Sequence, residues 1–518
     1  MVNNMKPAIW FRPAIITCLA SGICLTAIAP VGAQPAALAR SQANQKRSFA
    51  EYLKQHPITI DDAVSIALAT NPEIASALSA TLKAQGRTAE ARTALNPTAA
   101  IEAALTEFDD KTAISFGTSS FTSLNQFNPV FTAGVTLPLD VTGLLHTAIS
   151  QAQFEEAASR IDLSRVRNSL ALEVKAAFFN VLRSQAQLNA AQDTYNNSLV
   201  RQDMAEKSFK AGVAPRFDVI RAQTDVANSL QGVILARTGI KLAMASLKNT
   251  MGVDVAIPIT ISAEKAVVSP PVTPPTPAPT VPKRTAPNAP VEVGTLAPST
   301  VSDPLELGPE YTKASGEALA NRPEILETRA HLDAAKRGIR IARRSREIRV
   351  GFNLGYTLTP NNTAFQRENV GAATLQVNIP LFDGGVSKAR EEQARADVGT
   401  LEAALQSTID GVSLEVQRAY VSILQAQQRI VAAEAGLRQA RESARLARVR
   451  YAAGVSQQVG VSPLLELSDS ENSLASAELN QINALYDYNL ALAQLDRATG
   501  RYATIKSADA GRGAIRTR

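Results

Sequence analysis

The chain has 518 residues, of which 19% are charged and 5% are aromatic, and its formal net charge is +6. The length allows two or three domains of ordinary size, but the scarcity of aromatic residues favours long helices over a thick mixed core. The small positive charge gives no reason to expect nucleic acid as a partner.

Residues 1–33 are typical of a secretory signal peptide. Lys6 and Arg12 precede an apolar stretch that small residues follow, so cleavage is expected after Ala33 or, alternatively, after Ala39. Both cysteines of the chain lie in this segment. We therefore expect an exported chain without disulfides. Because no later apolar run reaches about 18 residues, we expect no membrane-spanning helix.

Residues 57–265 form the first of two predicted tandem repeats. The stretch "TIDDAVSIALATNPEI" predicts a short helix that stops before Pro72 and a second helix that begins at this proline. The periodicity then predicts two strands, a long helix and a return helix, over about 97–108, 127–139, 143–211 and 216–250.

A proline-rich segment, residues 266–311, separates the two repeats and is expected to be an extended linker. The second repeat, 312–503, opens with "TKASGEALANRPEI", and a basic tail over 504–518 follows it. The elements expected after that opening are two strands, a long helix and a return helix, over about 348–359, 370–381, 385–453 and 463–499.

The spacing of two short motifs supports the repeat. "TLPLDVTG" ends at Gly143 and "NIPLFDGG" ends at Gly385, which gives an offset of 385 − 143 = 242 residues. The glycines that end the two long helices, Gly212 and Gly454, have the same offset, 454 − 212 = 242. A glycine is the residue expected just beyond a helix C-terminus.

A heptad pattern runs along each predicted long helix. In the second repeat apolar residues, large except for one alanine, recur at every seventh position: Ile409, Val416, Ile423, Ile430, Leu437, Ala444 and Tyr451. Three positions later come Val412, Ala419, Ala426, Ala433, Ala440 and Ala447. The first repeat keeps the pattern, with breaks at Arg167 and Gln202. Such a seam predicts closely packed coiled-coil helices, each about 100 Å long at 1.5 Å per residue.

The four predicted strands alternate between apolar residues and small or polar ones. Their length suits a tilted strand that crosses a bilayer, as in an outer-membrane barrel. An antiparallel sheet that covers a soluble core would show the same alternation. Four strands are too few to close a barrel, and an open edge is unstable in lipid. If the strands face lipid, several chains must therefore share one barrel.

The order of these elements resembles the TolC family of outer-membrane efflux proteins. The motifs that carry the resemblance are "NPEI" and "RPEI", "LPLDVTG" and "IPLFDGG", "FKAGVAPRFDVIRAQ" and "RYAAGVSQQVGVSPLLELSDSE". The resemblance implies a mainly α protein with membrane β-strands: a homotrimer whose 12-stranded barrel stands in the outer membrane on a periplasmic coiled-coil tunnel. It also implies a passive exit duct that works with a periplasmic adaptor and an inner-membrane transporter.

The predicted turns between long and return helices carry the candidate site. Glu466 and Asp469 lie three residues apart near the start of the return helix, so both point from one face. The resemblance implies that carboxylates here form a selective gate in the tunnel mouth. They would equally be favoured by the helix dipole alone. The first repeat has Asp218 and Arg221 at the corresponding positions, a pair of mixed charge.

The turns themselves are candidate docking points for the adaptor. The resemblance places this contact at Gly212, Val213 and Ala214 and at Gly454, Val455 and Ser456. A glycine at the end of a helix also needs no partner to explain it. Four arginines before the second turn, at 438, 441, 445 and 448, are expected on a solvated helix face or, alternatively, in the tunnel lining.

No catalytic constellation is apparent. His56, His146 and His331 are scattered, and the segment after the signal peptide has no cysteine. We therefore expect no enzyme, no cofactor and no metal site. The alternative to a duct is a periplasmic coiled-coil adaptor or scaffold without a barrel, which would explain the heptads but not the paired strands. A third hypothesis, a secreted enzyme, is disfavoured because the sequence shows no catalytic site.

Overall fold

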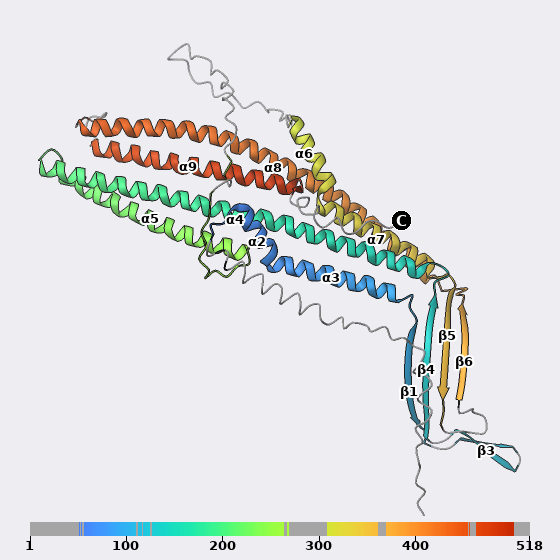
Figure 1. Cartoon of the computed structure of the whole chain (residues 1–518). Helices are drawn as coiled ribbons and strands as arrows, with labels where there is room; N and C mark the ends of the chain where they lie inside the picture. The colour runs from blue at the N-terminus through green and yellow to red at the C-terminus, as the bar shows by residue number, and fades with distance from the viewer. Residues whose placement is uncertain are drawn as a thin grey trace, which may run out of the picture.

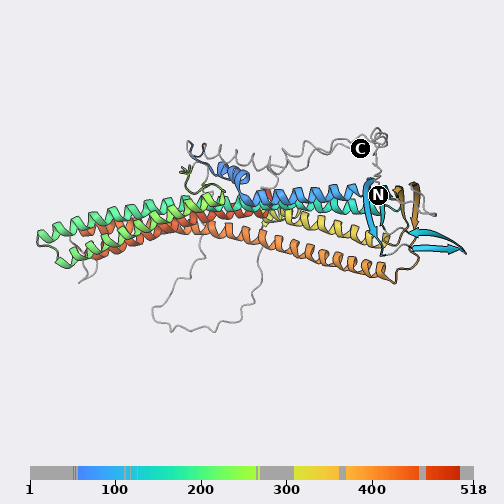
Figure 2. The same cartoon turned by 90° about the horizontal axis from the view of Figure 1, so that it is seen from below.

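The computed structural model describes residues 51, 53, 56–109, 112–116, 118–124, 127–263, 267–268, 308–360, 369–453, 455 and 463–501. Within these ranges the molecule is elongated: two hairpins of long helices lie side by side, and a sheet stands at one end of them (Figure 1, Figure 2). The expected signal peptide and basic tail and most of the expected linker lie outside the described residues.

The first repeat runs from two short helices through a strand pair to a long helical hairpin. Its elements are α2 (Ile60–Thr70), α3 (Pro72–Thr93), β1 (Thr98–Glu107), β2 (Thr112–Phe116), β3 (Ser119–Leu124), β4 (Phe127–Leu139), α4 (Leu144–Lys210) and α5 (Arg216–Thr250). Helix α4 is one residue shorter at each end than the helix expected over 143–211, and α5 has the expected bounds.

The second repeat has the same order of helices and long strands among its described residues, which leave out 361–368 between the two strands. Its elements are α6 (Gly308–Asn321), α7 (Pro323–Arg344), β5 (Arg349–Leu358), β6 (Asn369–Asn378), α8 (Val386–Ala452) and α9 (Pro463–Ala498). Helices α4 and α8 both have 67 residues, which makes each about 100 Å long.

Two expectations about the strands are wrong. The chain has an additional hairpin, β2 and β3, between the two strands expected in the first repeat. Strand β6 ends at Asn378 and not at 381. Its expected extension contains Pro380, which has no N–H group to donate to a neighbouring strand. Leu381 just beyond is 92% exposed.

The long strands form one antiparallel sheet in the order β1-β4-β5-β6, so the pairing of β4 with β5 joins the two repeats. Its register places small or polar residues opposite one another on one face, as in the pairs Gly134↔Gly355 and Thr132↔Thr357. The alternate positions carry apolar residues, as in Val135↔Leu354. Strands β1 and β6 pair on one side only within the described chain, so the sheet has two open edges.

The helices follow the same order as the strands. Near the sheet, neighbouring pairs are α3 with α4, α4 with α7 and α7 with α8. Towards the other end, α5 packs against α4, α4 against α9, and α9 against α8. The molecule is therefore a row of four helices along its whole length, in which α4 and α8 are continuous.

Each strand-to-helix connection contains an aspartate that binds the start of the long helix. The carboxylate of Asp140 accepts hydrogen bonds from the backbone N–H groups of Leu145 and His146 (3.1 and 2.9 Å). Asp383 accepts from Gly385 and Ser387 at 3.0 Å each. These bonds satisfy N–H groups that a helix start leaves without partners. Through the bonds from Ser387 and Gly385, the pKa of Asp383 falls to about 2.

A glycine closes each return helix against the Pro-Glu-Ile motif of its own repeat. Gly252 has φ +68°, and a Cβ at this position would lie 2.8 Å from Asn71 Cα. The Asn71 side chain donates to the Thr250 carbonyl oxygen (2.8 Å). In the second repeat Arg322 has the same role, donating to the Arg497 carbonyl oxygen (3.0 Å). The residue before the proline thus caps the return helix, whether it is asparagine or arginine.

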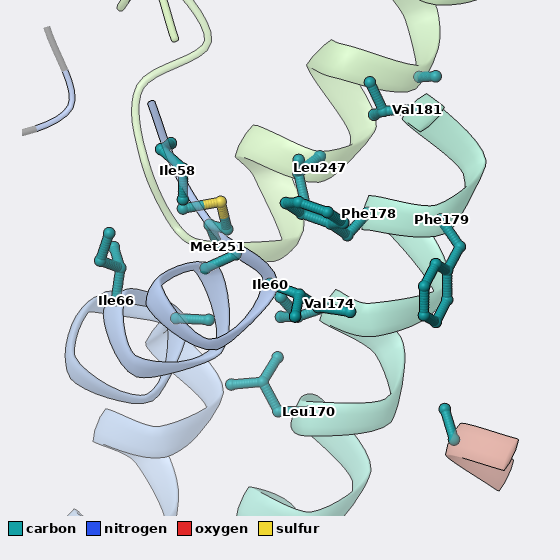
Figure 3. Packing of buried hydrophobic residues seen from close by; sticks show 14 of the residues in the cluster. Ile58, Ile60, Ile66, Leu170, Val174, Phe178, Phe179, Val181, Leu247 and Met251 are labelled. Carbon is teal, nitrogen blue, oxygen red and sulfur yellow. The ribbon is translucent and has the colours of Figure 1, made fainter. Parts of the chain in front are cut away.

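The largest core lies where α2 crosses α4 and α5, midway along the molecule (Figure 3). Phe178 and Val174 of α4 are fully buried there, and Leu247 and Met251 at the end of α5 face them. Each such side chain contributes about 1.5–3 kcal/mol through burial. A parallel bridge between Ile58 and Ile261 ties both ends of the first repeat to this core.

The heptad seam of α8 is confirmed. Nine of its thirteen positions are buried: Val412, Val416, Ala419, Ile423, Ala426, Ile430, Leu437, Ala444 and Ala447. The other four are half-buried. The helices in the described part of the chain include none that is long and apolar enough to cross a membrane.

Candidate functional site

The turn between α4 and α5 is a compact, glycine-dependent cap. Gly212 has φ +76°, and its N–H donates to the Phe209 carbonyl oxygen (3.0 Å). The next residue, Val213, donates to the Ser208 carbonyl oxygen (3.0 Å). This pair of bonds is the Schellman motif, which satisfies carbonyls that a helix end leaves without donors. Val455 makes the equivalent bond to Arg450 (3.0 Å) in the second repeat.

Apolar side chains are exposed at these turns. Val213 is 78% exposed, Val455 is 57% exposed, and Phe217 in the first turn of α5 is 65% exposed. Ala214 is half-buried, and Gly454 and Ser456 lie outside the described residues. The turns therefore present apolar surface to solvent at the end of the molecule opposite the sheet (Figure 1).

The two carboxylates expected at the start of α9 differ in their surroundings. Glu466 is half-buried and accepts a hydrogen bond from Arg450 Nη1 at 2.5 Å, so an arginine of α8 balances its charge. Asp469 is exposed. In the first repeat Asp218 is 6% exposed, and Arg221 is half-buried. The charged ring stays a prediction, and among these four residues Asp469 is the one that is exposed.

The tips of the two hairpins are packed against each other. Leu464 in the first turn of α9 forms a small buried cluster with Ala205 of α4 and Ala222 of α5. Tyr451 of α8 and Val219 of α5 pack against this cluster. The first turns of the return helices α5 and α9 therefore lie at the same end of the molecule and share one buried cluster.

A buried ionic cluster lies a few turns behind the tips, and it was not expected from the sequence. Arg201 of α4 is bonded through Nη1 to Glu471 Oε2 of α9, and both side chains are almost fully buried, 5% and 8% exposed. The second carboxylate oxygen of Glu471 accepts from Arg448 of α8 (2.9 Å). Nearby, Ser468 donates to Asp225 of α5 (2.9 Å). All four long helices contribute to this cluster.

The cluster places two arginines, Arg201 and Arg448, beside two carboxylates, Glu471 and Asp225. Burial lowers the pKa of the Arg201 guanidinium, and the neighbouring Asp225 carboxylate acts in the opposite direction. One feature of the sequence indicates this arrangement: the heptad series of α4 breaks at Gln202. The buried position at that level is Arg201, together with Ser198 and Ala205. Position alone could not identify Glu471 as its partner, because 270 residues separate the two.

Two of the three histidines lie beside carboxylates. His146 bonds through Nδ1 to Asp140 (2.6 Å) near the start of α4, and His331 lies 4.0 Å from Glu327. Across the ranges that the structure describes, no three of the His, Cys, Asp and Glu side chains are grouped so as to hold a metal ion. Arg445 pairs with Glu442 on the surface of α8 (2.7 Å).

Sequence comparison identifies similar proteins. The family model described as "Outer membrane efflux protein" matches residues 63–253 and 314–501. CyaE of Bordetella pertussis is 26% identical over 277 residues, which cover 53% of this chain and 51% of CyaE. The outer membrane protein TolC of Vibrio cholerae is 25% identical over 350 residues, covering 64% and 68%. The chain thus spans about half the length of CyaE.

Comparison of structures gives the same fold. The outer membrane protein VceC of Vibrio cholerae superposes with a TM-score of 0.65 over 85% of this chain and 96% of VceC, at 18% identity. The likeness at this level of identity concerns the arrangement of helices and strands alone.

Proposed function

Because the chain belongs to the outer membrane efflux protein family, we propose that it is the outer-membrane exit duct of an efflux or type I secretion system. Cargo passes through it from the periplasmic side to the exterior. The duct is passive: an inner-membrane transporter supplies the energy, and a periplasmic adaptor joins the two. The chain itself catalyses no reaction.

The observation that carries the proposal is the open row of strands and helices. Unpaired N–H and C=O groups at a sheet edge cannot remain exposed in lipid. The edges β1 and β6 of one chain can be satisfied by β6 and β1 of neighbouring copies. Three copies of the four-stranded sheet give 4 × 3 = 12 strands, more than the roughly eight of a barrel whose interior side chains fill. The apolar face of the sheet then meets lipid, and the polar face lines the duct.

The helix row has matching open edges. On α5, three leucine or isoleucine side chains are largely exposed in the single chain: Leu230 at 43%, Ile234 at 55% and Leu242 at 66%. On α8, at the other edge, Leu414 is 45% and Val449 is 57% exposed. Apolar stripes of this extent on a soluble helix mark an interface. We assign them to contacts between α5 of one protomer and α8 of the next.

Charge placed on one edge tests the closed trimer. Leu242→Lys puts a charge into the proposed interface, whereas Val200→Lys is a matched control on α4, which already has neighbours on both sides. Val200 is 58% exposed. The expected result, by native mass spectrometry of the detergent-extracted protein, is loss of trimer for Leu242→Lys only. Equal trimer in both variants would refute the assigned edge.

A periplasmic scaffold without a barrel is the competing function. Extraction and conductance of the unmodified protein distinguish it from the duct. The duct extracts from the outer membrane only with detergent, as a trimer that conducts ions in a planar bilayer. A water-soluble monomer in the periplasmic fraction would refute the duct and support the scaffold.

The tips opposite the sheet are the proposed adaptor contact and gate. Val213 and Val455 offer apolar surface for the adaptor, and Gly212 and Ala214 belong to the first turn. Gly454 and Ser456, proposed for the same contact, lie outside the described residues. Asp469 would set the charge of the mouth, together with the less exposed Glu466, Asp218 and Arg221. Since Asp469 is exposed and Glu466 is paired, Asp469→Asn should lower cation selectivity more than Glu466→Gln. Equal reversal potentials for the parent and Asp469→Asn in a salt gradient would exclude Asp469 from the gate.

A further inference from the structure

A pocket of about 240 Å³ lies where the sheet passes into the helices of the second repeat. It lies between the end of α7, the paired ends of β5 and β6, and the first turn of α8. Three arginines line it: Arg346, Arg349 and Arg390. Arg349 is fixed at the rim by a hydrogen bond from Nη2 to the Ser345 carbonyl oxygen (3.2 Å).

The charge of this arginine pocket is not balanced. Asp383 is the one acidic residue in its lining, and its oxygens already accept backbone bonds from Gly385 and Ser387. Glu391, the next carboxylate on α8, is held by Arg343 (2.8 Å) and Arg395 (2.7 Å) outside the pocket. Three positive charges therefore face one negative charge, an excess of two in each chain.

The pocket opens on the polar face of the sheet. Arg349 lies opposite Asn378 in the register of β5 and β6, and the alternate position after it pairs Gly351 with Gln376. The intervening position pairs Val350 with Val377 on the apolar face. In the proposed duct, on which this inference rests, Arg349 therefore faces the aqueous interior and not the lipid, and Arg346 and Arg390 line the same pocket.

The first repeat shows that the arginines are not needed to build this junction. The strand and preceding helix of the second repeat are offset by 349 − 98 = 251 residues from those of the first, and the long helices by 386 − 144 = 242. The counterparts of Arg346, Arg349 and Arg390 are thus Leu95, Thr98 and Ala148. The same strand-to-helix connection forms there without any of the three charges. A structural role for the arginines is therefore not required by the fold.

We propose that this arginine pocket is a binding site for the oxyanion groups, phosphate, sulfate or carboxylate, of anionic cargo that passes through the duct. Guanidinium groups bind such groups with paired, charge-assisted hydrogen bonds. Three pockets around the threefold axis place an excess of six positive charges at the barrel–tunnel junction, which raises the local concentration of anions. The duct then has an anion-attracting ring at the end of the tunnel opposite its periplasmic mouth.

Pyrophosphate is the test probe, and the repeat supplies the test variant. Arg349→Thr/Arg390→Ala introduces the residues that the first repeat has at these positions, so the junction is expected to fold. Arg343→Ala/Arg395→Ala removes the same number of charges from the same region outside the pocket and is the matched control. Calorimetry on the detergent-extracted trimer at low salt measures binding. We expect the pocket variant to bind pyrophosphate at least about tenfold more weakly, since it lacks two guanidinium groups that form charge-assisted hydrogen bonds to the anion. The control should bind like the parent.

A planar bilayer measurement separates this inference from the proposed function. Pyrophosphate should block the current through the parent and the control and block the pocket variant at least about tenfold less effectively. A trimer that binds pyrophosphate through these arginines but never conducts would refute the duct and leave the site standing. A conducting trimer that binds pyrophosphate equally in all three proteins, or in none, would overturn the site. Arginine-dependent binding to phosphatidylglycerol vesicles without binding of free pyrophosphate would also overturn it, in favour of a lipid headgroup.

Discussion

Replacing Glu471 by leucine should destabilise the tip half of the molecule by about 3 kcal/mol. Glu471 and Arg201 are bonded to each other with side chains only 8% and 5% exposed. Removing one partner of such a pair leaves an uncompensated buried charge, at a cost of about 3–5 kcal/mol. We expect the lower end, because Asp225 remains close enough to attract the Arg201 guanidinium.

Two further variants isolate the cause. Arg448 also donates to Glu471, but its side chain is 49% exposed. Arg448→Gln should therefore cost less than about 1 kcal/mol, as an exposed pair does. In Arg201→Met/Glu471→Leu both buried charges are absent, and the apolar replacements should restore most of the stability that Glu471→Leu loses.

Urea unfolding followed by far-UV circular dichroism measures these differences in the detergent-extracted protein. Hydrogen exchange locates them: amides of α4 and α9 around Arg201 and Glu471 should exchange faster in Glu471→Leu, and those of the sheet should not. The reasoning is refuted if Glu471→Leu and Arg448→Gln cost the same. It is also refuted if the double variant is as unstable as Glu471→Leu alone.

Three further predictions concern packing, backbone conformation and pH. Ala426 is 4% exposed on the seam, so Ala426→Leu should lower the free energy of unfolding by about 1–3 kcal/mol. Ala433→Leu should lower it less, because Ala433 is half-buried. Identical urea midpoints for the parent and both leucine variants would contradict the heptad register. Gly252→Ala should be more destabilising than Gly212→Ala in the same assay, because both have positive φ but only at Gly252 would the new Cβ meet a neighbouring backbone at 2.8 Å; the reverse order would show that steric contact is not the cause. Burial raises the pKa of Glu327 above its ordinary value of 4.5, so the parent loses stability as pH rises through the raised pKa. Glu327→Gln should therefore match the parent in acid and become relatively more stable towards neutral pH, and a difference independent of pH would contradict this.

The helices were predictable because their signals are local and repeated. A seven-residue period from Ile409 to Tyr451, about twelve helical turns, identifies the buried face of α8. Gly212 has the positive φ expected of a glycine just beyond the end of α4. The proline of each Pro-Glu-Ile motif begins α3 or α7 as expected. Strand β4 likewise has its expected bounds.

The sequence was less informative wherever the structure depends on distant partners. The β2–β3 hairpin mixes serine and threonine with apolar residues without strict alternation, so its sequence does not distinguish it from a connecting segment. The ionic cluster around Glu471 joins positions from both repeats, so no local pattern contains it. The carboxylates at the start of α9 were recognised, but the pairing of Glu466 with Arg450 depends on the packing of α8 beside α9.

The row of four helices explains why the chain needs two repeats and why its long helices have equal length. Each repeat alone supplies two adjacent helices near the sheet and two towards the tip, and the two repeats together supply the row of four. The short helices change places along the row, α3 giving way to α5 and α7 to α9, and only α4 and α8 continue through. Because both have 67 residues, the two turns reach the same level, and the apolar side chains and charges of both repeats meet at one end.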